Sequence, residues 1–204
     1  MQVNRDMLKE IAVRAIVALL FVLLSANLLA EFARTRHLTG LMLLLSESLV
    51  VILTLIRRQA LAIDRSRIAG LVTFVSVFGP PLLRPIGDPL LPDSITAVVS
   101  LVGLTLVVAG KVTLGRSFGL VPANRGVVAV GPYSIVRHPI YAGYLITHVC
   151  FLAAHPHPLN IALAAAADTA LIFRALLEER VLGRDVRYQV YCQRVTWHLV
   201  PGVF

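Results

Sequence analysis

The chain has 204 residues, of which 57% are hydrophobic and only 15% are charged. Soluble globular proteins are about 45–50% apolar and about 25% charged, so this composition excludes a typical soluble domain and a disordered chain. The net charge of +8 comes without a basic stripe that carries interleaved aromatic residues, so we expect no nucleic-acid partner. An excess of Lys and Arg is instead typical of the cytoplasmic loops of membrane proteins.

Six apolar segments predict membrane-spanning helices, because a helix needs about 20 apolar residues to cross the bilayer core. In chain order, they cover residues 11–30, 38–56, 68–83, 94–114, 140–154 and a run from about 159 into the sequence RALLEER. The first run follows Arg5 and Lys9, as a signal peptide would. It is too long for a signal sequence and more apolar runs follow, so we interpret it as a retained helix.

Helix-breaking residues separate these runs. Gly79-Pro80-Pro81 should end the third helix, because proline cannot continue a helix. Asp93 or Ser94 is expected to cap the fourth helix. The sequence His155-Pro156-His157-Pro158 predicts a tight turn between the last two spans.

The pattern therefore predicts an all-α fold, a polytopic helical membrane bundle of about six spans. Residues 1–110 hold the first four spans, and residues 111–204 hold a loop rich in Gly, Pro and Arg, two more spans and an amphipathic tail. With the tail in the cytoplasm, alternating spans leave outside only three of the 19 Lys and Arg residues, namely Arg34, Arg36 and Arg84. The positive-inside rule favours this orientation, so we expect a multi-pass protein of a bacterial inner membrane with its site facing the cytoplasm.

The most informative motif is GPYSIVRHPIYAGY, at residues 131–144. Pro139 suits the first turn of a helix, which would place His138 at the cap and Tyr141 in the first turn. Free N–H groups at a helix N-terminus favour a carboxylate or a phosphate. The alternative interpretation is that Arg137 and His138 only flank a span at the membrane interface.

Two further patterns follow the last apolar run. Arg174 and Glu178 are four residues apart and share one helix face, where they could form an ordinary ion pair. Charged groups at the end of an apolar run cost free energy unless they serve a function, so these two residues are also functional candidates. Tyr188, Tyr191 and Val195 recur at helical spacing and predict an interfacial amphipathic helix with an aromatic anchor.

These motifs stand in a specific order: G-P-Y-x-x-x-R-H-P-x-Y-x-G, then R-x-x-x-E-E, then G-x-x-Y-x-x-Y-x-x-R-V. In this order the chain resembles the isoprenylcysteine carboxyl methyltransferase family, within a wider group that includes the phospholipid N-methyltransferases. The resemblance covers roughly residues 111–200 and implies that 111–204 is a methyltransferase region. It implies S-adenosylmethionine as the cofactor and a lipidic or prenylated acceptor, with a carboxylate as the methylated group.

The resemblance also implies the site residues. The implied cofactor-binding residues are Arg125, Gly126, Val127, Val128, Tyr133, His138, Pro139, Ile140, Tyr141 and Glu178. Arg174 falls on the position that binds the acceptor, so Arg174 and Glu178 are the residues expected to serve the reaction. A sulfonium is already an activated leaving group, and orientation with exclusion of water can supply much of the catalysis. The pattern accordingly calls for no metal, and the two cysteines show no metal-ligand spacing.

Three alternatives stay open from the sequence. A phospholipid-type N-methyltransferase would use the same cofactor on an amine. A membrane steroid-type reductase has a similar plan but binds NADPH. A transporter or non-enzymatic scaffold is favoured by Glu47 and Asp168, because carboxyl groups within predicted spans are functional candidates.

Overall fold

The computed structural model describes residues 38–204 and, before them, residues 11, 15, 19, 22, 26, 29, 30 and 33. The predicted first span, residues 11–30, therefore lies largely outside the described residues. The side chain of Glu47 lies outside them as well.

The described chain is mostly helical. Its α-helices are α2 (Leu38–Ile56), α3 (Arg67–Phe78), α4 (Asp93–Leu114), α5 (Pro139–Ala154), α6 (Pro158–Leu182) and α7 (Val186–Arg194). Three short 3-10 helices are η1 (Pro80–Leu82), η2 (Gly115–Ser117) and η3 (Gly131–Ser134), and two short strands are β1 (Ala62–Ile63) and β2 (Ala123–Asn124).

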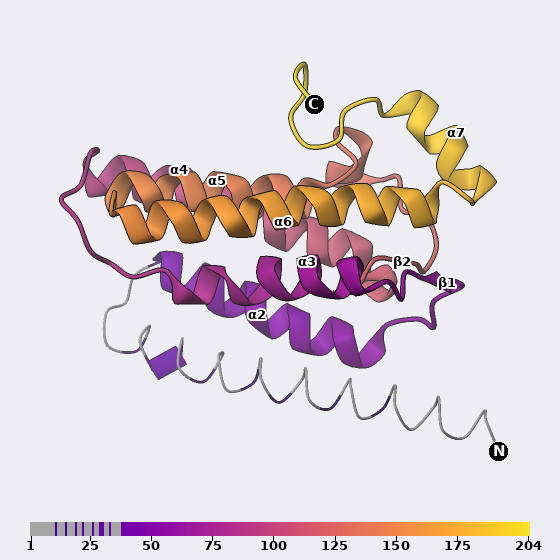
Figure 1. Ribbon diagram of the computed structural model, residues 1–204, viewed down its shortest axis with the longest axis horizontal. Coiled ribbons are helices and arrows are strands. Elements are labelled where there is room, and N and C mark those ends of the chain that lie inside the picture. Colours follow the sequence, from indigo (N-terminus) through magenta and orange to yellow (C-terminus); the bar gives the residue numbers. More distant parts are fainter. Residues whose placement is uncertain are drawn as a thin grey trace.

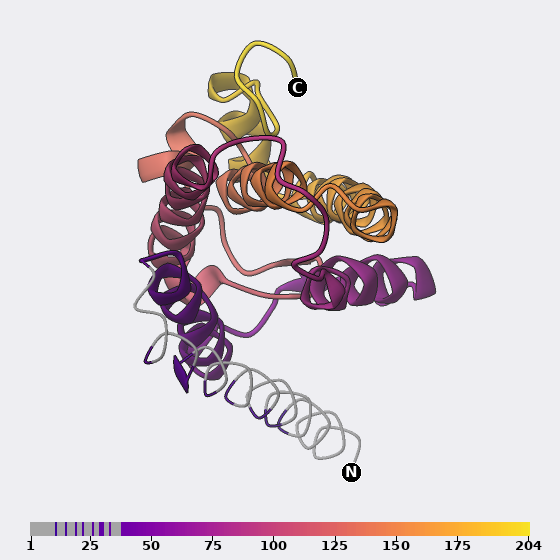
Figure 2. The ribbon, with the colours of Figure 1, turned by 90° about the vertical axis from the view of Figure 1, so that its left-hand side faces the viewer.

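The long helices run along one axis and pack side by side in the order α2, α4, α5, α6, α3 (Figure 1). Seen from the end of the bundle, they form an arc, and the segment between α4 and α5 crosses its inner side toward α3 (Figure 2). This arrangement places the loop predicted over residues 115–138 against α3 and α6.

Most helix boundaries confirm the sequence predictions. α3 ends at Phe78, directly before Gly79-Pro80-Pro81, and His138 is the cap of α5 with Pro139 in the first turn. The predicted cap of α4 is wrong. Asp93 already lies inside the helix, Pro92 takes the cap position, and no side chain there accepts a capping hydrogen bond.

The mostly helical fold agrees with the predicted all-α class, but the structure adds a short strand pair that the sequence pattern did not predict. β1 and β2 pair antiparallel, with Ala62 opposite Asn124 and Ile63 opposite Ala123. This two-residue ladder joins the segment before α3 to the segment after α4. Two residues are too few to show the alternation that identifies a strand in a sequence.

Two helices in the described part are long and apolar enough to cross a membrane, Asp93–Ser117 and Pro158–Leu182, each of 25 residues. α3 and α5 are shorter, with 12 and 16 residues. At 1.5 Å per residue they extend about 18 and 24 Å, less than the roughly 30 Å hydrocarbon core. A bundle of about six spans therefore stays a prediction.

Glycine brings α4 and α5 into close contact. A Cβ atom added to Gly143 would lie 2.6 Å from the Gly103 carbonyl oxygen and 2.7 Å from a methyl group of Val107. A Cβ atom on Gly110 would lie 2.7 Å from the Ile140 side chain. The start of α5, which carries the predicted site residues, is thus fixed against α4 at a distance that larger side chains would not permit.

Candidate functional site

Tyr141 connects the two residues of α6 that the sequence singles out. Its hydroxyl group donates a hydrogen bond to Glu178 Oε2 at 2.8 Å, and its ring lies 5.2 Å from the Arg174 guanidinium carbon. Tyr141 is buried in the first turn of α5, and the other two residues are one turn apart on α6. The predicted acceptor-side and cofactor-side residues therefore meet at one tyrosine.

Arg174 is a buried cation, with 6% of its surface exposed. Its Nη1 lies 3.5 Å from the Ser76 hydroxyl and its Nη2 lies 3.4 Å from the Gly119 carbonyl, both long contacts. Its Nε has no hydrogen-bond partner in the described part of the chain. A buried charge without a counter-ion carries a desolvation penalty of several kcal/mol, so an anion placed here would be stabilised.

The alternative of an ordinary Arg174–Glu178 ion pair is wrong for this structure. No carboxylate oxygen among the described side chains lies within ion-pair distance of Arg174. Glu178 instead accepts the Tyr141 hydroxyl. The two residues share a helix face, as predicted, but their side chains have different partners.

A second buried guanidinium group lies beside the same loop residue. Arg125 is 7% exposed, and a Cβ atom on Gly119 would lie 2.2 Å from its Nη1. The carbonyl of Gly119 also faces Arg174 Nη2. Gly119 thus separates two buried cations, a role that the sequence did not reveal because nothing distinguishes it from the other loop glycines.

Glu179, the neighbour of Glu178, is the centre of a separate cluster. Its carboxylate pairs with Arg137 Nη1 at 3.1 Å, His138 Nε2 at 3.0 Å and His198 Nδ1 at 2.7 Å. Arg137 and His138 therefore have specific partners within the protein, and whether they also lie at a membrane interface stays a prediction. Glu179 and His198 were missed, and the adjacent glutamates gave no sequence signal to tell one from the other.

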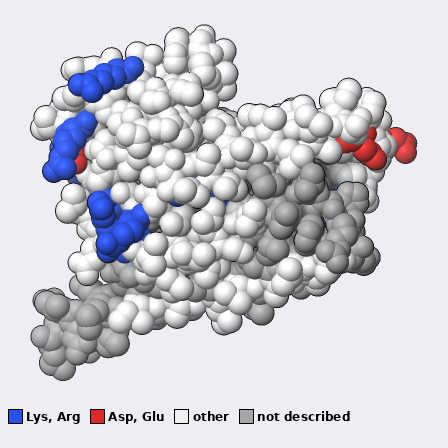
Figure 3. All heavy atoms as spheres, turned by 180° about the vertical axis from the view of Figure 1, so that it is seen from behind, with Lys and Arg blue, Asp and Glu red and all other residues white. Residues whose placement is uncertain are grey.

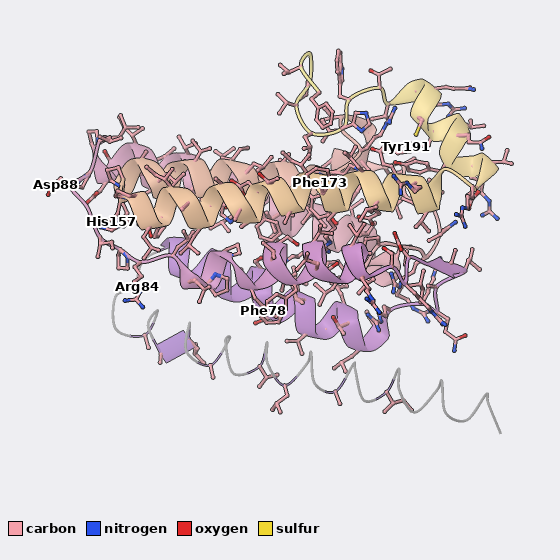
Figure 4. All side chains as sticks on the ribbon, viewed as in Figure 1. Phe78, Arg84, Asp88, His157, Phe173 and Tyr191 are labelled. Atoms are coloured by element: carbon pink, nitrogen blue, oxygen red, sulfur yellow. The ribbon has the colours of Figure 1, made fainter. Side chains whose placement is uncertain are left out.

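The C-terminal segment packs on the start of α5. The backbone N–H groups of Arg137 and His138 donate to the carbonyls of Trp197 and His198, each at 2.9 Å. Arg137 Nε donates to the Val195 carbonyl at 2.8 Å. The tail and α7 therefore lie over the end of α5 and α6 that carries the site (Figure 4).

The helical spacing predicted for α7 is confirmed, but its aromatic residues pack inside the protein, so their role as a membrane-interface anchor stays a prediction. Tyr188, Tyr191 and Val195 form a buried cluster against which Val127 packs. The Tyr191 hydroxyl donates to the Tyr133 carbonyl at 2.7 Å, and burial raises the pKa of Tyr191. The aromatic residues of α7 thus join the tail to the segment that precedes α5.

The remaining predicted cofactor-binding residues lie in two places, the segment that precedes α5 and the first turn of α5 itself. Burial raises the pKa of Tyr133, and the Glu178 carboxylate raises it further. Gly126 has a φ of +100° and its N–H donates to Asn124 Oδ1, while Val128 is partly buried. Pro139 and Ile140 belong to the core, as do their neighbours on α4. Because these two side chains are buried in the core, we expect only their backbone atoms to reach a ligand, whereas the Tyr141 side chain of the same turn contacts Glu178.

Asp168, the carboxyl group that favoured a transporter or scaffold, has a close partner. Its Oδ1 lies 2.5 Å from His148 Nδ1, and the His148 ring stacks on Tyr144. Lys111, nearby on α4, is 1% exposed and donates to Ser46. Within the described residues, no group of three or more His, Cys, Asp and Glu side chains could hold a metal ion.

Comparison with known proteins adds no assignment. No model of a known protein family matches the chain, and a search of curated proteins finds no match either.

Proposed function

We propose that the chain is a membrane methyltransferase that uses S-adenosylmethionine and methylates a carboxylate on a lipidic or prenylated acceptor. The observation that carries this proposal is the contact of Tyr141 with both Arg174 and Glu178. Arg174, a buried cation, and the Glu178 carboxylate lie one turn apart on α6, and both face the start of α5 through Tyr141. Two ligands of opposite local charge can be held there side by side.

The donor set fits the cofactor. Glu178 can accept hydrogen bonds from an ammonium group or a ribose hydroxyl. The first turn of α5 has no side-chain cap, so its backbone N–H groups and the helix dipole can hold a carboxylate. In this proposal the segment from Arg125 to Val128 and the ring of Tyr133 complete the cofactor site. When bound, the cofactor supplies a methyl group on a sulfonium, which is an activated leaving group.

Arg174 is the residue proposed to hold the acceptor. Its planar guanidinium can bind a carboxylate through two parallel hydrogen bonds, which fixes the direction of the nucleophilic oxygen. The same buried cation disfavours an amine acceptor, because a protonated amine would be repelled. This contrast favours carboxyl O-methylation over phospholipid N-methylation.

Other residues of the chain supply orientation rather than acid–base chemistry. The Tyr141 ring lies against Arg174 and its hydroxyl holds Glu178, so one side chain sets the spacing of both ligand sites. The tail, which Arg137 joins to α6 through Glu179, lies over this end of the helices, and we expect it to help exclude water from the bound reactants. Positioning of two reactants in a dry site is a sufficient source of rate for an in-line displacement.

The membrane setting rests on composition and charge. The two 25-residue apolar helices and the gathering of Lys and Arg at one end of the bundle (Figure 3) support a multi-pass protein whose site faces the cytoplasm. A lipidic acceptor would reach Arg174 from the apolar surroundings of α3 and α6.

Calorimetric titration of the purified protein in detergent with S-adenosylmethionine, and in parallel with NADPH, tests the proposal. We expect binding of S-adenosylmethionine alone. Glu178→Gln should weaken that binding by about 10- to 150-fold, the equivalent of one charge-assisted hydrogen bond. Binding of NADPH without S-adenosylmethionine would support the reductase instead.

Transfer of a labelled methyl group from S-adenosylmethionine to a membrane lipid extract tests the acceptor role. Arg174→Ala should abolish transfer while it leaves cofactor affinity intact, and Arg194→Ala, an exposed arginine on α7, is the matched control. An equal loss of cofactor affinity in Arg174→Ala and Glu178→Gln would contradict the division of roles.

A further inference from the structure

A groove with a volume of about 330 Å³ lies outside the site described above. One wall comes from β1 and the first turn of α3, and the other comes from the last turns of α6. Arg65, Arg180 and Arg184 line it together with Ile63, Leu177 and Val181. The methyl-transfer chemistry proposed for Tyr141, Arg174 and Glu178 uses none of these residues.

The groove carries a net positive charge. Three arginines face one acidic residue, Asp64, and none of the three guanidinium groups lies within ion-pair distance of a described carboxylate. Asp64 is already engaged, because its Oδ1 accepts the Ser66 backbone N–H at 2.8 Å. Hydrogen bonds from Ser66 hold the pKa of Asp64 below its usual value, and the charges of Arg180 and Arg184 lower it further. The groove therefore favours an anion.

The same groove has an apolar wall. Leu177 and Val181 lie one turn apart on α6, opposite Ile63 and the 64% exposed Ile68. An inorganic anion would use only the arginines. A phosphate that is attached to glycerol and acyl chains would use both the charged and the apolar side of the groove.

The position of the groove suits a lipid headgroup. It lies where α6, one of the two helices long enough to cross a membrane, ends at Leu182. In the view from behind, the visible Lys and Arg gather at one end of the bundle, and most of the visible Asp and Glu lie at the other end (Figure 3). Asp88 marks the opposite end, far along the bundle from α7 (Figure 4). Basic residues at the end of a span meet the anionic leaflet of a membrane.

We propose that this groove binds the phosphate of an anionic phospholipid headgroup through Arg65, Arg180 and Arg184, with the glycerol and first methylene groups against Ile63, Leu177 and Val181. This inference stands on the groove and its charges, and it holds whether or not the chain transfers methyl groups. Because the arginines are exposed, the binding is sensitive to salt, which screens charges over about 10 Å at 0.1 M ionic strength.

The test is calorimetric titration of the full chain in an uncharged detergent with three probes: dihexanoyl phosphatidylglycerol, dihexanoyl phosphatidylcholine and inorganic phosphate. We expect the anionic lipid to bind more tightly than either of the others, and added salt to weaken it. The double variant Arg180→Gln/Arg184→Gln should lower the affinity for the anionic lipid about 30-fold. Each basic residue near an anionic membrane surface strengthens binding by about five- to sixfold, and the two factors multiply. Arg65→Gln should lower the affinity by a smaller factor in the same direction.

The matched control is Arg187→Gln/Arg194→Gln, which removes the same charge from exposed positions on α7. It should leave the affinity for the anionic lipid within about twofold, because screening limits the reach of distant surface charges. Equal losses in the two double variants would overturn the proposal in favour of diffuse attraction. Equal affinity for inorganic phosphate and the anionic lipid would show a simple anion site, and equal affinity for the two lipids would show that the arginines take no part.

Discussion

Glu178 and Glu179 are consecutive residues of one helix, yet their carboxylates have very different partners. Glu179 is surrounded by Arg137, His138 and His198, which satisfy both of its oxygens. Glu178 receives one tyrosine hydroxyl, and the nearby buried Arg174 has no described carboxylate partner. The difference separates a carboxylate with three cationic or imidazole partners from one that we propose to bind the cofactor.

The largest expected effect comes from removing the satisfied carboxylate. Glu179→Ala leaves Arg137, His138 and His198 without their shared acceptor, and hydrogen bonds to charged groups are worth about 1.5–3 kcal/mol each. Because the Glu179 side chain is only 15% exposed, solvent replaces little of this. We expect a loss of about 3 kcal/mol, or a fall in Tm of about 6–12 °C for a chain of this size. Thermal unfolding in detergent measures it, and an unchanged Tm would show that the cluster does not anchor the tail.

A second prediction concerns the frame that carries Tyr141. Gly143→Ala would place a Cβ atom 2.6 Å from the Gly103 carbonyl oxygen, so α4 and α5 would have to separate. Overpacking of this kind costs about 1–3 kcal/mol, and we expect about 2 kcal/mol. Gly70→Ala on α3 is the control, since nothing lies within 4 Å of its added Cβ atom, and it should stabilise the helix by about 0.8 kcal/mol. Similar unfolding temperatures for the two variants would mean that the glycine contact does not set the position of α5.

The third prediction places Glu178 below Glu179 in structural importance. In Glu178→Gln the side-chain amide oxygen can still accept the Tyr141 hydroxyl, so only part of one hydrogen bond is lost. We expect a loss of stability of about 1 kcal/mol or less. Thermal unfolding beside Glu179→Gln provides the comparison. A loss in Glu178→Gln that equals the loss in Glu179→Gln would remove the distinction between the two carboxylates.

The smallest effect on stability is expected at Arg174. Arg174→Met keeps an unbranched side chain over the Tyr141 ring and removes a buried charge whose hydrogen bonds are long. Replacement of a buried ionic group by an apolar one of similar size is often neutral or stabilising, so we expect a change within about 0.5 kcal/mol. A loss comparable with that of Glu179→Ala would show that Arg174 belongs to the fold. Chemical denaturation of the two variants side by side decides between these outcomes.

The sequence alone determined the helices and most of their ends. Apolar runs of helical length with Gly79-Pro80-Pro81 and Pro139 at their boundaries are local signals, because proline and glycine act on the backbone where they stand. Helical spacing likewise predicted that Arg174 and Glu178 share a face, and that Tyr188, Tyr191 and Val195 form another. These features need no knowledge of what lies opposite.

Only the tertiary structure decided what each of these side chains meets. Periodicity places Arg174 and Glu178 on one helix face. It cannot show that Tyr141, more than 30 residues earlier in the chain, contacts both side chains and that the two form no ion pair with each other. It cannot distinguish Glu178 from Glu179, because the distinction comes from Arg137 and the C-terminal segment. A residue's own type and spacing set its face and its charge. Its partners are set by how distant segments pack, and in this chain it is the partners that separate a structural carboxylate from a candidate functional one.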